Sequence, residues 1–246
     1  IRHGITLGRD VHLKDLHREF DAVFLATGLQ STNRLGLDGE DAANVLDAVA
    51  YIERLRQTPD KASLPVGRHV VVIGGGNTAI DIAVQTRRLG AETVTLVYRR
   101  GVEHMGATPH EQAVARANGV VIRTWARPVA LDVADGLARA VTFERTAPGA
   151  DGRLQGTGER LTLPADQVFK AIGQTLGHAE DGAAALIEVE AGKIKVDDAF
   201  RTSLHGVFAG GDCTAAGPDL TVVAVEDGKR AAAAIQAHLA GREGRR

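Results

Sequence analysis

Three glycine-centred segments of this chain combine residue types and spacings that can bind a phosphate-bearing ligand. The clearest is Gly74-Gly75-Gly76-Asn77-Thr78-Ala79, which follows the aliphatic run 70–73 and precedes a predicted helix over 77–89. In this Gly-x-Gly-x-x-Ala pattern, Gly74 permits a tight turn, Gly76 lets the backbone approach a pyrophosphate, and Ala79 lets the helix pack against the strand. The helix N-terminus favours phosphate charge. The segment predicts a dinucleotide site, and a glycine-rich turn without a ligand is the alternative.

The end of the next predicted strand, 93–98, indicates which dinucleotide the site takes. NAD sites carry an acidic residue there, about twenty residues past the glycines, which binds the ribose 2′-hydroxyl. This strand is instead followed by Arg99 and Arg100. Two guanidinium groups can bind the 2′-phosphate of NADP through paired charge-assisted hydrogen bonds. The pair favours NADPH, with NADH possible, and the alternative is a solvated basic strand end.

An internal echo indicates two related nucleotide domains. Residues 21–28 and 166–173 share the pattern Asp-x-Val-Phe-x-Ala-x-Gly, and each predicts a short buried strand that ends in glycine. The strand ends Ala26-Thr27-Gly28 and Ala171-Ile172-Gly173 are therefore candidate cofactor-contacting residues. We interpret the echo as one nucleotide domain inserted into another, and chance similarity between two buried strands is the alternative.

The third segment is Gly210-Gly211-Asp212-Cys213, which follows a predicted strand and precedes a predicted helix over 221–239. A turn of this kind can place Gly211 and Asp212 against a ribityl hydroxyl. Thr221 and Val222 begin a helix whose N-terminus can point at an electron-rich ring. The alternative is a Gly-Gly-Asp turn without a ligand.

In this order, the three segments resemble the nucleotide- and flavin-binding region of the glutamate synthase small-subunit family. The matching residues are Ala26-Thr27-Gly28, Gly74-Gly75-Gly76-Asn77-Thr78-Ala79, Tyr98-Arg99-Arg100, Ala171-Ile172-Gly173 and Gly210-Gly211-Asp212-Cys213. The stretch 110–128 also resembles the pyrimidine-reducing branch of that family, the bacterial dihydropyrimidine dehydrogenases. The resemblance covers nearly the whole chain and implies an NAD(P)H-dependent flavoprotein oxidoreductase.

The resemblance further implies that the chain takes part in electron input. NADPH would give a hydride to FAD, and electrons would pass through iron–sulfur clusters to a second catalytic subunit or domain that reduces a pyrimidine or makes glutamate. The family's first Gly-x-Gly-x-x-Gly and its cysteine-rich segments are missing from this sequence, which opens with Ile1. We therefore expect a C-terminal fragment, inactive alone, with FAD and the clusters belonging to the intact parent. The alternative is an NADP-binding module without flavin or catalysis of its own.

Composition argues against several other classes. With a net charge of −2, the chain lacks the basic footprint of a nucleic-acid-binding protein, and it has no apolar run of about twenty residues to span a membrane. A single cysteine, Cys213, cannot form an internal disulfide, an iron–sulfur cluster or a multi-thiolate metal site. Hydride transfer to a flavin needs orientation rather than a strong acid or base, so no catalytic or metal-ligating residue is predicted. We expect a cytoplasmic protein.

Positioning these segments requires an α/β architecture. We predict a Rossmann-like NAD(P)-binding domain with a β-meander, inserted in a discontinuous, incomplete FAD-binding domain. The predicted domains are 1–62 (the end of the first FAD-domain segment and a linker), 63–174 (the NAD(P)H-binding domain) and 175–246 (the second FAD-domain segment). Within the middle domain, alternating short strands and turns over 120–163 predict the meander on one face of a parallel sheet.

Overall fold

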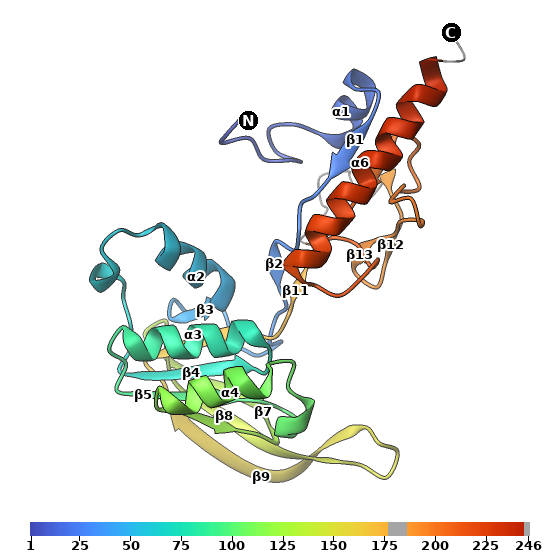
Figure 1. The fold of residues 1–246 in the computed structure, drawn as a ribbon. Helices are drawn as coiled ribbons and strands as arrows, with labels where there is room; N and C mark the ends of the chain where they lie inside the picture. Colours follow the sequence, from blue (N-terminus) through green and yellow to red (C-terminus); the bar gives the residue numbers. More distant parts are fainter. Residues whose placement is uncertain (177–185, 244–246) are drawn as a thin grey trace. The chain divides into compact units, whose positions relative to one another are not determined.

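A computed structural model describes residues 1–176 and 186–243, and these residues divide into two compact units (Figure 1). Unit 1 combines Ile1–Ser31 with Gln174–Arg246, and unit 2 is the continuous stretch Thr32–Gly173. The first domain border predicted from sequence is 62/63, whereas compactness places it at 31/32. Residues 32–62 lie with unit 2 because β3 (Val45–Asp47) pairs with a strand of its sheet.

Unit 2 is built on a parallel sheet with strand order β3-β10-β4-β5-β6. The other strands of this sheet are β4 (His69–Gly74), β5 (Thr93–Val97), β6 (Val120–Arg123) and β10 (Gln167–Ala171). The sheet is covered on both faces, which explains why β4 is an uninterrupted aliphatic run rather than an alternating one. The parallel, covered sheet confirms the predicted fold class.

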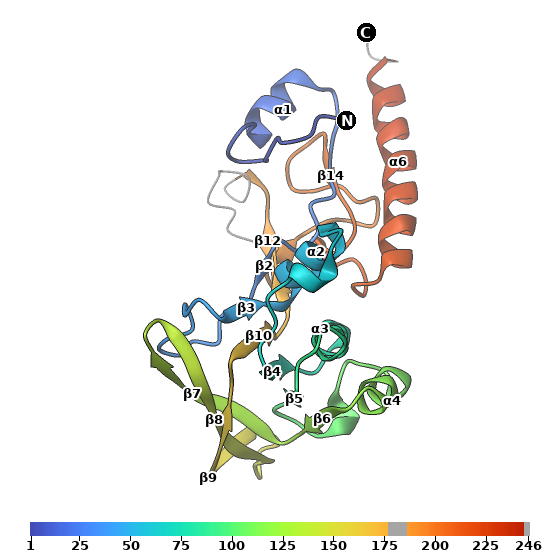
Figure 2. The same cartoon turned by 90° about the vertical axis from the view of Figure 1, so that its left-hand side faces the viewer.

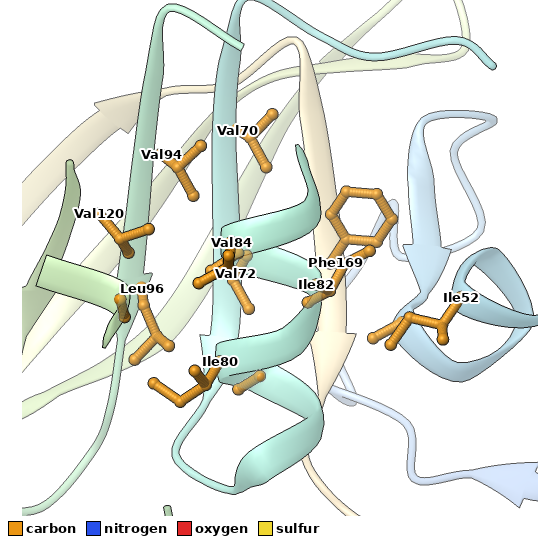
Figure 3. Packing of buried hydrophobic residues seen from close by; sticks show 14 of the residues in the cluster. Ile52, Val70, Val72, Ile80, Ile82, Val84, Val94, Leu96, Val120 and Phe169 are labelled. Carbon is orange, nitrogen blue, oxygen red and sulfur yellow. The ribbon is translucent and has the colours of Figure 1, made fainter. Parts of the chain in front are cut away.

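Helices cover one face of this sheet. They are α2 (Ala48–Gln57), α3 (Asn77–Arg88) and α4 (Pro109–Ala117), and short 3-10 turns η1 (Lys61–Ser63) and η2 (Val102–His104) lie in the connections. Because strand side chains alternate between faces, Val70 and Val72 of β4 pack under the helices. Figure 3 shows this layer, in which Ile82 of α3 and Phe169 of β10 lie between the sheet and α2. The helix α3 buries Ala79, Ile82, Ala83 and Thr86 completely.

An antiparallel meander covers the other face (Figure 2). It consists of β7 (Ala126–Ala134), β8 (Leu137–Pro148) and β9 (Leu154–Pro164). Val71 and Ile73, the alternate residues of β4, pack against Val141 and Phe143 of β8. The meander was predicted from residue 120 onward, but 120–123 belong to the parallel sheet, because β6 pairs with β5. The predicted meander therefore begins only at Ala126.

Unit 1 has its own small core. Strand β1 (Val23–Leu25) pairs in parallel with β14 (Val207–Ala209), and α1 (Leu13–Glu19) and α6 (Thr221–Glu243) belong to the same unit. Leu13, Leu25, Val207, Ala209 and Cys213 are buried together. The remaining strands are β12 (Val189–Glu190), which pairs with β13 (Lys193–Ile194), and β2 (Ser31–Thr32), which pairs with β11 (Gln174–Thr175). The helix α6 extends four residues beyond the predicted range 221–239.

A buried charge cluster fixes the connector 34–47 to the sheet of unit 2. Lys170 of β10, whose side chain is only 12% exposed, places its Nζ 3.3 Å from Asp47 and 3.6 Å from Glu40. The Glu40 carboxylate also accepts hydrogen bonds from the backbone N–H groups of Gly36 (2.6 Å) and Leu37 (3.3 Å). Burial alone would raise the pKa of Glu40, but these two donors and the nearby Arg34 and Lys170 cations hold it below its ordinary value.

We expect Glu40→Gln to lower the free energy of unfolding at pH 7 by about 1.5–3 kcal/mol, the usual value of hydrogen bonds to a charged group. Because the folded-state pKa of Glu40 is lowered, its contribution is present above the unfolded pKa of about 4.5 and is lost as the pH falls through the folded value. Urea unfolding of both proteins between pH 7 and pH 3.5 measures this. A difference that stays constant over the whole range would contradict the prediction.

Candidate functional site

The three glycines after β4 have different structural reasons to be glycine. Gly74 has φ +150°, and a Cβ there would collide with the carbonyl oxygen of Ala171 in β10. A Cβ on Gly75 would collide with the ring of Tyr98. A Cβ on Gly76 would meet no atom of the described residues within 4 Å, and its φ of −93° suits any residue. Packing therefore requires Gly74 and Gly75, whereas the open space is in front of Gly76.

The helix α3 begins directly at this open space. Gly76 is its N-cap residue, and its carbonyl accepts from the N–H groups of Ala79 (3.0 Å) and Ile80 (3.3 Å). Asn77 and Thr78 lie in the first turn, where backbone N–H groups have no intrahelical acceptor, and no side chain of the described residues caps them. Ala79 is completely buried against the sheet, as predicted from its small size. The helix end therefore offers free donors and a positive dipole end to an anion.

The loop between β5 and α4 folds back onto the glycine turn, a feature that was not predicted from sequence. Ala107 donates its N–H to the carbonyl of Gly75 (3.0 Å), and the Tyr98 hydroxyl donates to the carbonyl of His104 (2.8 Å). A capping box between Thr108 and Glu111 fixes the end of this loop at the start of α4. The sequence signal was the Thr-x-x-Glu spacing just before a helix.

Arg99 and Arg100 follow β5 at the same edge of the sheet as the glycine turn. Both side chains are exposed, and neither makes an ion pair or side-chain hydrogen bond with the residues that the structure describes. Their backbone is fixed, because the carbonyl of Arg99 accepts from the Thr146 hydroxyl (2.6 Å) and that of Arg100 accepts from the N–H of Trp125 (3.1 Å). The position is held while both guanidinium groups stay available to an anion.

The strand end Ala171-Ile172-Gly173 lies beside the glycine turn, because Ala171 is the register partner of Gly74. Asn33 holds the two following residues. Its side chain donates to the carbonyl of Ile172 (3.2 Å), and its backbone N–H donates to the carbonyl of Gly173 (3.1 Å). The structure thus brings the predicted residues 74–79, 99–100 and 171–173 together at the carboxyl edge of one sheet, where ligands bind in open α/β sheets.

The other predicted residues lie in unit 1. Ala26-Thr27-Gly28 follow β1, and Gly211 and Asp212 follow β14, so both segments leave the same edge of this parallel pair. The Asp212 side chain is half-buried and makes no hydrogen bond or ion pair within the described residues. Asp227, buried on α6, accepts a hydrogen bond from the N–H of Gly211 (3.1 Å) and ties the turn to this helix.

The first turns of α6 present an apolar surface. Thr221 and Val222 are exposed, and the aliphatic side chains of Leu220, Val222 and Val225 are 50%, 73% and 61% exposed. Cys213 is buried, and its thiol donates to the carbonyl of Gly210 (3.2 Å), in keeping with its predicted packing role. Across the described ranges, 1–176 and 186–243, His, Cys, Asp and Glu side chains form no group of three that could hold a metal ion.

One carboxylate near the glycine turn has a shifted titration. Burial raises the pKa of Asp81, on the second turn of α3, and the Glu111 carboxylate raises it further, against the opposing effect of Arg56. Asp81 is therefore a weaker acid than an exposed aspartate. This supports the interpretation that it serves local electrostatics, since it is held by its own helix layer rather than directed at a reacting group.

Comparison with known proteins gives the class. The sequence model of the pyridine nucleotide-disulphide oxidoreductase family matches residues 3–228, and the chain belongs to this family. The membership confirms the predicted enzyme class, an NAD(P)H-dependent flavoprotein oxidoreductase, and the cofactor pair of that class, NADPH and FAD.

Particular relatives then define the neighbourhood within the class. The glutamate synthase [NADPH] small chain of Escherichia coli is 36% identical over 93% of this chain, and the NAD-dependent dihydropyrimidine dehydrogenase subunit PreT of the same organism is 34% identical over 98%. The alignments cover 52% and 53% of those relatives, so the chain spans about half their length. The resemblance predicted from sequence is confirmed.

Solved structures confirm the fold. FprA from Mycobacterium tuberculosis in complex with NADPH superimposes with a TM-score of 0.76 at 20% identity, over 98% of this chain and 68% of FprA. Thioredoxin reductase of T. acidophilum gives a TM-score of 0.68 at 22% identity, over 87% of this chain and 64% of that one. At these identities the likeness concerns the fold alone.

Two alanine substitutions separate the packing glycine from the open one. We expect Gly75→Ala to lower the free energy of unfolding by about 1–3 kcal/mol, because the new methyl group overpacks against Tyr98. Gly76→Ala should change it by less than about 1 kcal/mol, the range of N-cap replacements. Urea denaturation followed by circular dichroism measures both. Equal losses would mean that the space in front of Gly76 is filled.

Proposed function

We propose that this chain is the electron-input part of a flavin-dependent oxidoreductase that oxidises NADPH. The observation that carries the proposal is the glycine turn, in which Gly74 and Gly75 are required by packing while Gly76 faces open space. A glycine that packing does not require, at a helix start with uncapped N–H groups, is what a pyrophosphate needs for close approach.

In this proposal the dinucleotide lies along the carboxyl edge of the sheet in unit 2. Its pyrophosphate binds the backbone of Gly76, Asn77 and Thr78 at the start of α3. Its 2′-phosphate binds the unpaired guanidinium groups of Arg99 and Arg100, which suit a phosphate better than a ribose hydroxyl. FprA, the solved structure with the same fold, is described as a complex with NADPH, which supports this placement.

The residues of unit 1 fit a flavin nucleotide. The Asp212 carboxylate has no partner among the described residues and can accept a hydrogen bond from a ribityl hydroxyl. Thr221 and Val222 open α6 with exposed, partly apolar surface that suits a flavin ring, and Gly28 and Gly211 adopt φ of +63° and +79° at the strand ends. When bound, FAD accepts a hydride and releases electrons singly. The chain's residues bind and orient both cofactors, and the step needs no side-chain acid or base.

Beyond the flavin, electrons pass through iron–sulfur clusters in other segments to a second catalytic subunit or domain. The names of the relatives support this, because they are chains or subunits of larger enzymes, including the beta subunit of the NADP(+)-dependent formate dehydrogenase of Moorella thermoacetica, 37% identical over 97% of this chain. Pyrimidine reduction and glutamate synthesis are the proposed final reactions. In the described part of the chain, no helix has the length and apolarity to cross a membrane, and we propose a cytoplasmic location.

We expect Gly76→Val to abolish NADPH binding while the protein remains folded, because the branched side chain fills the space that the pyrophosphate needs. Isothermal calorimetry with NADPH measures the binding, and circular dichroism verifies the fold. Unchanged affinity in the folded variant would reduce the glycine segment to a turn without a ligand.

Removing both arginines tests cofactor choice. Charge-assisted bonds of about 1.5–3 kcal/mol each predict that Arg99→Ala/Arg100→Ala weakens NADPH binding at least about tenfold, with little change for NADH, which lacks the phosphate. A control variant, Arg139→Ala/Arg153→Ala, removes the same charge from exposed positions in the meander. Equal affinities of the wild type for both nucleotides, or parallel losses in the arginine variant, would contradict the NADP assignment.

A further inference from the structure

Trp125 has an unusual backbone conformation at the edge of the candidate dinucleotide site. Its φ is +58°, a left-handed value that costs a non-glycine residue free energy. Asp135 and Ala191 also have positive φ, but each precedes a glycine in a tight hairpin turn, where this conformation is expected. Trp125 has no such turn, because it lies between β6 and β7, where the chain leaves the parallel sheet for the meander.

Hydrogen bonds on both sides hold Trp125 in this conformation. Its N–H donates to the carbonyl of Arg100 (3.1 Å), and its carbonyl accepts from the N–H of Thr146 (2.9 Å). The next residue, Ala126, donates to the carbonyl of Tyr98 (3.1 Å), and the Thr146 hydroxyl donates to the carbonyl of Arg99 (2.6 Å). The backbone of Trp125 is thus bonded directly to that of the arginine pair.

Packing of the core does not account for the indole. Trp125 is half-buried and belongs to neither apolar cluster of unit 2, although Ile122 and Ala126 on either side of it do. The ring partner recorded for it is His104, whose ring lies edge-to-face with the indole at a centroid distance of 6.4 Å. His104 belongs to the loop that folds back onto the glycine turn.

These contacts order the groups along the carboxyl edge of the sheet. Gly75 at the end of β4 lies against the ring of Tyr98, which follows β5 and whose hydroxyl binds the carbonyl of His104. The His104 ring meets that of Trp125, which follows β6. Past the glycine turn, a ligand that runs along this edge therefore meets first the arginine pair and then two aromatic rings.

We propose that the Trp125 indole, with the His104 ring beside it, forms the wall against which the adenine base of the dinucleotide stacks. The inference rests on the proposed NADPH function and adds a positioning group for its base. The adenosine ribose carries the 2′-phosphate, so a phosphate bound by Arg99 and Arg100 brings adenine to the next position along the edge. A flat, apolar base with a π face is the ligand that an indole binds by stacking.

The sequence supplies a direct probe, because Trp125 is the single tryptophan of the chain. The ligand for the test is adenosine 2′,5′-bisphosphate, which carries the base and the 2′-phosphate but no nicotinamide. We expect its binding to quench the tryptophan emission of the wild-type chain, with the same dissociation constant by fluorescence and by calorimetry.

A matched pair of variants separates stacking from bulk. Trp125→Phe keeps an aromatic ring, whereas Trp125→Leu keeps an apolar side chain without one, and both have an unbranched Cβ at the same strained backbone position. We expect the leucine variant to bind the bisphosphate about tenfold more weakly than wild type, and the phenylalanine variant within about threefold. Val133→Ala, on β7, is the control for loss of a partly exposed apolar side chain and should bind as wild type does.

The outcomes distinguish this inference from the function on which it rests. Calorimetric binding of the bisphosphate without a change in tryptophan emission, or equal affinities of the leucine and phenylalanine variants, would overturn the adenine wall and leave NADPH binding intact. Failure of the wild-type chain to bind either NADPH or the bisphosphate would overturn both. The fluorescence result uses only the wild-type chain, so an unfolded variant does not remove the test.

Discussion

The close approach of two backbones at the end of β4 is the constraint on which the rest of unit 2 depends. Gly74 lies against the carbonyl of Ala171, and any side chain there would push the central strand away from β10. Because all strands of this sheet run parallel, that contact keeps their carboxyl ends level. The helix α3 then starts from the centre of the edge, and the residues after β5 and β6 lie along it.

The strand β10 extends this constraint into both layers of unit 2. Phe169 packs into the helix layer, where its ring meets Tyr51 edge-to-face at 5.0 Å. Lys170, the next residue, binds Glu40 and Asp47 of the connector. The two neighbours on one strand therefore secure the helices by apolar contact and the connector by charge. A buried lysine with two carboxylates is tolerated because Glu40 has further donors in Gly36 and Leu37.

The sequence predicted what depends on local pattern. The aliphatic run before Gly74 and the spacing up to Ala79 were sufficient for the strand, the turn and the buried face of α3. What depends on distant partners could not be predicted. The strand 120–123 has the same short apolar character as a meander strand, and only its pairing with β5 assigns it to the parallel sheet. Likewise, no local signal joins residues 34–47 to Lys170, and none indicates the positive φ of Trp125.

The division of unit 1 into two chain segments sets the order in which the molecule can assemble during synthesis. Unit 2 is continuous and has all its strands once residue 173 has been made, whereas β1 cannot pair with β14 until residue 209 exists. A folded unit 2 shortens the loop that this late pairing must close, and so reduces its entropic cost. The first 31 residues wait unpaired until then, so a substitution that slows the folding of unit 2 delays the completion of unit 1 without touching any of its residues.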